Sequence, residues 1–345
     1  MSEIAAAAPG SRNLITDVPG LKVGQAHDAA VRTGVSVILP DDRAVTACDV
    51  RGGGPGTRET DALKPENLVE AVDAIVLSGG SVYGLAAADG VAAWLGAQGR
   101  GYGLVVQPGV PKSPVIPAAI LYDLANGGDK AWGEDPPYRR LGREAVVSAG
   151  LDFELGTTGA GYGAMAGSLK GGTGSASLIS ADGIAVGALV AVNSFGSVVA
   201  PGGRTFWAAP YEMGDEFGGL GPAGLRAAPD DWGLAKADPR ARMNTTIACV
   251  ATDVALTPAQ AKRVAVMAQD GLARAIRPIH APFDGDVVFA LSTACRPLPQ
   301  DADFAIARIG ALAADALARA VARAVYAATP WLGTDVPTWR DLLSK

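Results

Sequence analysis

The clearest alternation of apolar and polar positions lies in the last third of the chain. Residues 245–252 and 286–292 are apolar runs of strand length, and each precedes a longer stretch with apolar side chains at helical spacing. Thr257 followed by Pro and, at the third helical position, Gln predicts a capped helix start, and we expect that helix to end near Ala275. A second helix is expected over 303–328. The pattern predicts two strand–helix units here.

The first part of the chain has shorter apolar runs separated by glycine. Residues 34–50 predict two strands around an Asp-Asp turn, which we expect to form a hairpin, followed by a glycine-rich loop at 51–57. Residues 73–78 predict a buried strand, which a glycine turn at 79–81 connects to an Ala-rich helix over 82–95. This part predicts a hairpin and a strand–turn–helix unit.

The middle of the chain combines a clear hairpin with long irregular stretches. A helix is expected over 140–148, followed by a Gly/Ser tract at 156–175. Residues 174–180 and 184–193 alternate in the manner of strands and are joined by an Ala-Asp-Gly turn. Residues 201–243 follow no periodicity, and irregular stretches of this length are usually functional or act as linkers. This long segment ends directly before the predicted strand at Thr245.

Composition excludes several classes of function. The formal net charge of −6 over 345 residues, with no run of Lys or Arg, argues against a nucleic-acid partner. The three cysteines are isolated from one another, which argues against a disulfide framework and against a zinc site. The first residues lack the basic start and apolar core of a signal peptide, and no apolar run is long enough to span a membrane. We expect a soluble cytoplasmic protein with no cofactor and no metal.

Histidine is scarce, and this restricts the catalytic possibilities. A hydrolase triad normally needs a histidine base, and the chain has only two histidines, His27 and His280. The segment Gly79-Gly-Ser-Val-Tyr-Gly84 resembles a nucleophile elbow, but its closing glycine is one position late. The segment Gly159-Ala-Gly-Tyr-Gly-Ala164 matches a dinucleotide fingerprint without the preceding strand that such a site requires. A glycine turn is the more probable interpretation of the first segment, and the match of the second is weak.

One arrangement performs acyl transfer without histidine. If the Asn244–Thr245 peptide bond is cut, Thr245 gains an α-amine that can act as the base for its own hydroxyl. A free α-amine has a pKa of roughly 7.7 to 8.0, which suits a general base near neutral pH. An irregular segment that ends at Asn244, followed by a Thr that opens a strand, fits this chemistry. A Thr at the start of a strand is also ordinary, so spacing alone leaves both interpretations open.

Three segments together carry a resemblance to a known family. The segments are Asn244-Thr-Thr-Ile-Ala248, Asp284-Gly-Asp-Val-Val-Phe-Ala290 and Gly79-Gly-Ser-Val-Tyr-Gly-Leu85. With them the chain resembles the self-cleaving L-aminopeptidase/D-amidase-esterase family, which includes β-peptidyl aminopeptidases and the endo-type 6-aminohexanoate (nylon) oligomer hydrolase. The similarity runs from about Asn13 to the last long helix.

The resemblance implies both a fold and a maturation pathway. It implies an α/β fold, the αββα sandwich of the N-terminal-nucleophile kind, in which residues 1–345 form one intertwined domain. Self-cleavage between Asn244 and Thr245 would give a large fragment, 1–244, and a small fragment, 245–345, which stay together, commonly as a tetramer of such pairs.

The resemblance also implies roles for single residues. Thr245 matches the nucleophile, and Asn193 matches the asparagine of the oxyanion site. Lys170 matches a lysine near the nucleophile, and Tyr83 matches a tyrosine that lines the site. Two carboxylates that would orient a protonated amine are contributed by Asp284 and Asp286. The Thr nucleophile and this acidic pair are similar to the nylon-oligomer branch, because the β-peptidyl branch uses Ser and a Ser-x-Glu pair.

Several functions remain open from the sequence. The leading hypothesis is an aminopeptidase or amidase that acts on peptides, amides or esters of amino acids through an acyl group on Thr245. An endo-amidase acting on 6-aminohexanoate oligomers is the alternative within the class. An acetyltransferase of the ornithine acetyltransferase kind and a metabolite-binding protein without catalysis are the alternatives from other classes.

Overall fold

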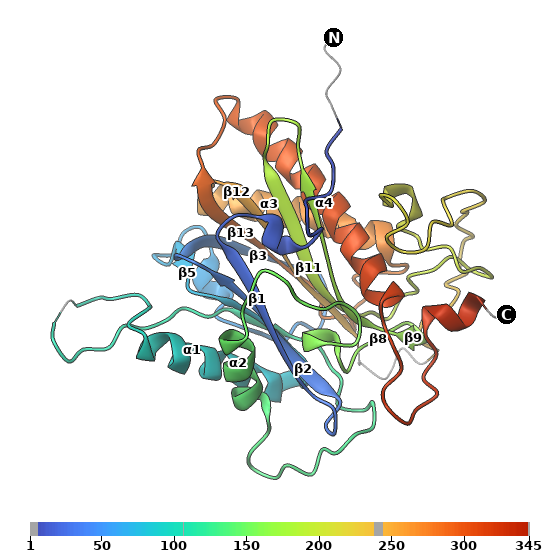
Figure 1. The fold of residues 1–345 in the computed structure, drawn as a ribbon, viewed down its shortest axis with the longest axis horizontal. Coiled ribbons are helices and arrows are strands. Elements are labelled where there is room, and N and C mark those ends of the chain that lie inside the picture. Colours follow the sequence, from blue (N-terminus) through green and yellow to red (C-terminus); the bar gives the residue numbers. More distant parts are fainter. Residues whose placement is uncertain (1–5, 106, 238–243, 344–345) are drawn as a thin grey trace.

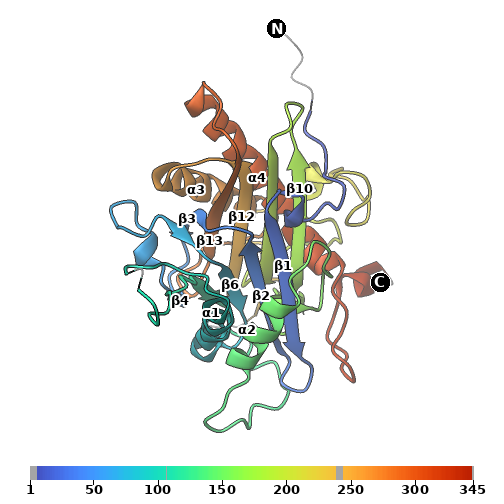
Figure 2. The ribbon, with the colours of Figure 1, turned by 60° about the vertical axis from the view of Figure 1, so that its left-hand side comes forward.

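Two β-sheets face each other, and each carries a pair of helices on its outer side (Figure 1). The structure is a computed structural model that describes residues 6–105, 107–237 and 244–343. In Figure 2, α1 and α2 lie in the lower part of the view near β2, and α3 and α4 lie in the upper part near β12 and β13. The α/β fold predicted from the resemblance, an αββα sandwich, is confirmed.

The larger sheet has six strands in the order β10-β11-β12-β13-β3-β5. Its neighbours are antiparallel except for the central pair, β12 and β13, which run parallel. The strands are β3 (Ala44–Val50), β5 (Ala71–Val72), β10 (Gly172–Ile179), β11 (Ala185–Asn193), β12 (Thr245–Val254) and β13 (Val287–Arg296). The hairpin of β10 and β11 was predicted from alternation and is confirmed, with Gly172 opposite Val192.

The smaller sheet has five strands in the order β1-β2-β6-β7-β4. They are β1 (Leu21–Asp28), β2 (Thr33–Pro40), β4 (Thr57–Arg58), β6 (Ile75–Ser78) and β7 (Ala118–Ile120). A separate short pair joins β8 (Met165–Ala166) to β9 (Leu169–Lys170).

The predicted hairpin over residues 34–50 is wrong. Its two strands exist as β2 and β3, but they lie in different sheets. Both edges of β2 are already paired, one with β1 and the other with β6, so β2 has no edge left for β3. After the Asp41-Asp42 turn the chain therefore crosses to the other layer, where β3 pairs with β13.

The four α-helices match the helical patterns of the sequence, with one shift. They are α1 (Ala87–Ala97), α2 (Tyr138–Val147), α3 (Pro258–Ala275) and α4 (Ala302–Tyr326). The capping box of Thr257 and Gln260 is present at the start of α3. The helix expected over 82–95 begins instead as a 3-10 turn, Ser81–Ala86, and becomes α-helical only at Ala87.

The core consists of three apolar layers. One lies between the two sheets, one between the larger sheet and α3 with α4, and one between the smaller sheet and α1 with α2. The helix α4 lies very close to β10, where a side chain at Gly174 would meet the carbonyl of Ala320 at 2.0 Å. Glycine at this position therefore permits the close contact between the helix and the sheet. In the described part of the irregular segment, residues 201–237, one 3-10 turn forms at Ala209–Tyr211.

Candidate active site

Thr245 is the first residue of β12 and lies opposite Asn193, the last residue of β11. Because β12 and β13 are parallel, the residues just before β13 reach the same end of the sheet as Thr245. The strand β3 runs antiparallel to β13, so the loop that follows Val50 arrives there as well. The sheet topology therefore brings three segments together at the same end of the larger sheet: the start of β12, the acidic segment 284–286 and the glycine-rich loop.

The peptide unit between Asn244 and Thr245 is buried and held from two sides. Thr245 Oγ1 donates a hydrogen bond to the carbonyl oxygen of Asn244, and the backbone N–H of Gly285 donates to the same oxygen at 3.2 Å. Asn244 and Thr245 are both almost fully buried. The hydroxyl of the predicted nucleophile therefore contacts the carbonyl group that self-cleavage would attack.

Asp286 fixes the first residues of β12. Its Oδ1 accepts the backbone N–H of Thr246 at 2.7 Å, and its Oδ2 lies 2.9 Å from His280 Nδ1 and accepts the His280 N–H at 3.1 Å. The carboxylate is completely buried. Asp286 thus connects the nucleophile strand to the loop that precedes β13.

Asp284 is the second buried carboxylate at this end of the sheet. Its Oδ2 accepts the N–H of Ala281 at 3.0 Å, while Oδ1 has no hydrogen-bond partner within the described residues. Burial and the neighbouring Asp286 carboxylate raise the pKa of Asp284, and the ammonium of Lys236 acts in the opposite direction. A buried carboxylate oxygen without a donor is costly unless a charged partner arrives.

The glycine-rich loop supports the acidic segment from below. The N–H of Gly54 donates to the carbonyl of Asp284 at 2.7 Å, and the N–H of Arg51 donates to the carbonyl of Asp286 at 3.0 Å. A side chain at Gly52 would meet the Asp286 nitrogen at 2.3 Å, so only glycine permits this approach. The sequence pattern predicted this loop but indicated no role for it.

Asn193 is held in one orientation by backbone groups on either side. Its Oδ1 accepts the N–H of Met165 at 2.9 Å, and its Nδ2 donates to the carbonyl of Tyr122 at 3.0 Å. In the register of β11 and β12, Asn193 lies directly opposite Thr245.

Lys170 is fully buried, but its ammonium points to backbone carbonyls. Its Nζ donates to the carbonyls of Gly171 and Ala164, at 2.8 and 3.1 Å, and lies 5.0 Å from the centre of the Trp331 ring. Burial lowers the pKa of Lys170 to about 7. None of the contacts found for its Nζ in the described part of the chain is with Thr245; the connection runs through Met165, which pairs with Lys170 and holds Asn193.

Tyr83 lies in the 3-10 turn after β6 and is 46% exposed. Its ring contacts the edge of Trp132, with the centroids 5.7 Å apart. The turn itself lies beside Asp123, whose Oδ1 accepts the N–H of Gly80 at 2.7 Å. No contact between Tyr83 and Thr245 is present in the described residues, so its role in substrate binding stays a prediction.

A small cavity of about 80 Å³ opens beside Asn193. Its wall includes Asp123, Lys236 and Met165, so a carboxylate and an amine both border it. Asp123 is buried and accepts the Thr33 hydroxyl at 2.7 Å. Burial raises the pKa of Asp123 to about 6, and burial lowers the pKa of Lys236 to about 7.

The chain matches one known protein family over most of its length. The profile of Peptidase family S58 matches residues 13–338. The chain belongs to peptidase family S58. Membership confirms the resemblance found in the sequence and shows a hydrolase that acts on peptide or amide bonds.

Proteins similar to this S58 peptidase include aminopeptidases and an oligomer endohydrolase. It is 44% identical to an uncharacterized aminopeptidase of Mycobacterium tuberculosis (strain H37Rv), over 96% of this chain and 98% of that protein. It is 29% identical to a 6-aminohexanoate-oligomer endohydrolase of Kocuria sp. (strain KY2), over 82% of this chain and 76% of that protein. The solved L-aminopeptidase D-Ala-esterase/amidase from Ochrobactrum anthropi has the same fold, a variant of the Ntn hydrolase fold, with a TM-score of 0.69 at 21% identity over 96% and 91% of the two chains.

These similarities support the hydrolase hypothesis over the alternatives from other classes. They give no support to an acetyltransferase or to a binding protein without catalysis. In the parts of the S58 peptidase that the structure describes, no helix has the length and apolar character needed to cross a membrane. Within the same residues, no three or more His, Cys, Asp or Glu side chains gather as metal ligands would.

Three site residues of the S58 peptidase were missed or undervalued in the sequence. Lys236 lies in the irregular segment and Asp123 follows a short strand, and neither belongs to a motif with recognisable spacing. His280 received no role from the sequence, yet its Nδ1 lies 2.9 Å from Asp286 Oδ2. The one available signal was the proximity of His280 to the acidic segment along the chain.

Proposed function

We propose that this S58 peptidase is a self-processing N-terminal-threonine aminopeptidase or amidase. It cleaves its own Asn244–Thr245 bond and then hydrolyses peptides, amides or esters of amino acids through an acyl group on Thr245. The observation that carries the proposal is the contact of Thr245 Oγ1 with the carbonyl oxygen of Asn244 at the first residue of a buried central strand. A nucleophile held against its target in this way reacts as an intramolecular group.

The site offers a partner for each group that the reaction produces. Cleavage gives Thr245 an α-amine, which acts as the base for the Thr245 hydroxyl. The unpartnered oxygen of Asp284 is suited to receive an N–H of this amine, and Asp286 keeps the strand in place. Asn193 donates its amide N–H to the oxyanion of the substrate. Lys170 acts by supporting the turn that holds Asn193.

The cavity beside Asn193 favours release of N-terminal residues. Asp123 contributes a carboxylate to its wall, which is suited to bind the ammonium group of a substrate. A substrate whose free amine binds to Asp123 is cleaved next to its N-terminus. Tyr83, exposed on the turn beside Asp123, contacts the substrate further out.

Endo-cleavage of 6-aminohexanoate oligomers is the second candidate, and it is favoured by the 29% identity to endohydrolases with that activity in their names. Parallel assays of an aminoacyl p-nitroanilide and of a 6-aminohexanoate oligomer blocked at its amine separate the two. Cleavage of the blocked oligomer at the faster rate favours the second candidate.

Intact-mass measurement tests self-processing directly. The 34.8 kDa chain is expected to convert into fragments with the masses of residues 1–244 and 245–345. Thr245→Ala is expected to stay whole, because it lacks the attacking oxygen, and Thr245→Ser to cleave slowly. A wild-type chain that remains whole and inactive on amides rules out the proposal, and cleavage of the alanine variant indicates another nucleophile.

The mature assembly completes the proposal. We expect a tetramer of cleaved pairs in the cytoplasm, with no cofactor. Native mass spectrometry measures the stoichiometry.

A further inference from the structure

The carbonyl oxygen of Asn244 is the atom that gains negative charge during self-cleavage. Attack by Thr245 Oγ1 turns the carbonyl carbon tetrahedral and places the charge on this oxygen. Among the described residues, two donors reach it: the Thr245 hydroxyl and the backbone N–H of Gly285, at 3.2 Å. The hydroxyl becomes the nucleophile and loses its proton, so the Gly285 N–H is the donor that remains.

The side chain of Asn244 is not one of these donors. It is buried, and neither its nitrogen nor its oxygen has a hydrogen-bond partner within the described residues. The Asn244 side chain therefore gives its own carbonyl no hydrogen bond, and the Gly285 N–H is the backbone group that polarises this carbonyl.

Gly285 is held firmly by its neighbours. The carbonyls of Asp284 and Asp286 on either side accept hydrogen bonds from Gly54 and Arg51, at 2.7 and 3.0 Å. A donor fixed before the reaction stabilises the developing charge without having to reorganise.

The residue type at position 285 fits this role. A Cβ at Gly285 would lie 2.7 Å from Thr245 Oγ1 and 2.8 Å from the Gly54 carbonyl. Only glycine brings its N–H to the Asn244 carbonyl while leaving room for the attacking hydroxyl.

We propose that the backbone N–H of Gly285 is the oxyanion donor for self-cleavage, which rests on the proposed function. The Thr245 Oγ1–Asn244 carbon bond forms, the bond from that carbon to the Thr245 nitrogen breaks, and the hydroxyl proton ends on this nitrogen. Water then hydrolyses the ester, restores the hydroxyl and leaves Asn244 with a carboxylate. The Gly285 N–H stabilises both tetrahedral intermediates.

Replacing a single amide by an ester tests the proposal. Glycolic acid in place of Gly285, introduced by nonsense suppression in cell-free translation of the full chain, removes the N–H and adds no atom to the side chain. Self-cleavage, followed by gel and intact mass, is expected to slow by about 10²- to 10³-fold, the usual effect of losing one oxyanion donor. An unchanged rate in a folded chain, monitored by circular dichroism, overturns the proposal.

The matched control is glycolic acid in place of Gly54. This change removes the Gly54 N–H bond to the Asp284 carbonyl in the same pair of loops but leaves the Asn244 carbonyl untouched. Because it loosens the support of Gly285 without removing the donor itself, it is expected to slow self-cleavage clearly less than the Gly285 ester does, and equal slowing of both esters overturns the proposal in favour of loop support alone.

A second pair of variants needs no unnatural residue. Gly285→Ala crowds Thr245 Oγ1, whereas a Cβ at Gly54 has its nearest neighbour, the Asp284 oxygen, at an ordinary 3.6 Å. Gly285→Ala is expected to block cleavage and Gly54→Ala to permit it; normal cleavage of Gly285→Ala overturns the close approach on which the proposal depends. A wild-type chain that never cleaves refutes the proposed function itself, whereas normal cleavage of the Gly285 ester refutes only this inference.

Discussion

At the scale of single residues, Asp123 gives the site a measurable pH signature. In the proposed mechanism the Thr245 amine must be deprotonated, and because an ordinary α-amine has a pKa of about 7.7 to 8.0, log kcat/KM is expected to rise with a slope of about 1 below that range. Burial raises the pKa of Asp123 to about 6, and below this pH the carboxylate also becomes protonated and loses the substrate ammonium. The slope is therefore expected to steepen to about 2 below pH 6, as measured in a kcat/KM profile.

Asp123→Asn is expected to abolish the steeper slope below pH 6 and to keep the slope of about 1 above it. Its kcat/KM should fall by about 10- to 100-fold, which corresponds to losing a hydrogen bond between charged groups. The control is a substrate that lacks the amine, for which wild type and variant are expected to behave alike. If the steeper slope below pH 6 persists in Asp123→Asn, a group other than Asp123 causes it.

Lys170 is expected to act on stability. Lys170→Met leaves the carbonyl of Gly171 without its buried ammonium donor and the carbonyl of Ala164 with the Gly171 N–H alone, so the free energy of unfolding should fall by about 2 kcal/mol. Lys112→Met, at an exposed lysine, is the control and should change it by less than about 0.5 kcal/mol. Denaturant unfolding measures both. Unchanged stability combined with lost activity in Lys170→Met would indicate that the amine acts in catalysis directly.

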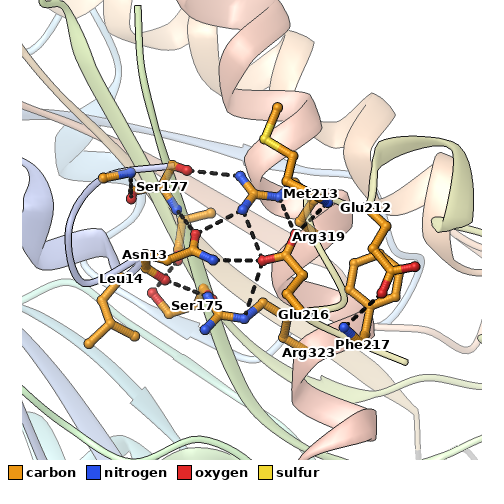
Figure 3. Close-up of polar contacts among 12 residues, drawn as sticks. Asn13, Leu14, Ser175, Ser177, Glu212, Met213, Glu216, Phe217, Arg319 and Arg323 are labelled. Carbon is orange, nitrogen blue, oxygen red and sulfur yellow. Dashed lines mark hydrogen bonds and ion pairs between the residues drawn. The ribbon is translucent and has the colours of Figure 1, made fainter. Parts of the chain in front are cut away.

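At the scale of elements, a buried ion network fastens the irregular segment to α4 (Figure 3). Arg319 donates to both carboxylate oxygens of Glu216, at 2.6 and 2.9 Å, and to the side-chain oxygen of Asn13 at 2.8 Å. Arg323 adds an ion pair to Glu216 at 3.6 Å. Burial raises the pKa of Glu216, but the hydrogen bonds and charge of Arg319, together with the bond from Asn13, outweigh this effect. The pKa of Glu216 therefore lies below its ordinary value. Three segments far apart in sequence thus meet at one carboxylate.

Glu216→Gln tests the strength of this junction. The change removes the negative charge of the carboxylate that the buried Arg319 guanidinium bonds, and breaking a buried pair in this way costs about 3–5 kcal/mol. Asp215→Asn, one residue earlier and exposed, is the matched control and should be close to neutral. The readout is the free energy of unfolding; equal values for the two variants would show that the network adds no stability.

Elements with their own periodicity were predictable from the sequence, whereas their pairing was not. The capped start of α3 and the hairpin of β10 and β11 depend on neighbouring residues, so local patterns suffice. The partner of β2 depends on which edges other strands already occupy, and no local pattern records this. Lys236 and Asp123 were not predicted for the same reason: they lie near Asn193 only because the chain folds, and no local pattern records that proximity. The acidic segment 284–286 was found because it adjoins a strand that reads clearly.

At the scale of the whole molecule, the proposed cleavage point lies inside a continuous sheet. The strands β12 and β13 follow Thr245, but they lie between β11 and β3, which precede it. The helices α3 and α4, also after Thr245, cover the face of this sheet. Separating the fragments would expose the edges of central strands and an apolar layer, so we expect them to remain together under native conditions.

This arrangement predicts that two separate chains can replace self-cleavage. Residues 1–244 are coexpressed with residues 245–345, the latter behind a removable tag whose cleavage leaves Thr245 first. We expect an active complex that elutes as one species in size-exclusion chromatography, because the strand ladders need no covalent link between Asn244 and Thr245. Residues 245–345 expressed alone are expected to be insoluble, since both of their strands lack a partner on one edge. A complex that forms without activity would show that Thr245 needs the self-cleavage step to reach its working geometry, and fragments that elute apart would contradict the role of the shared sheet.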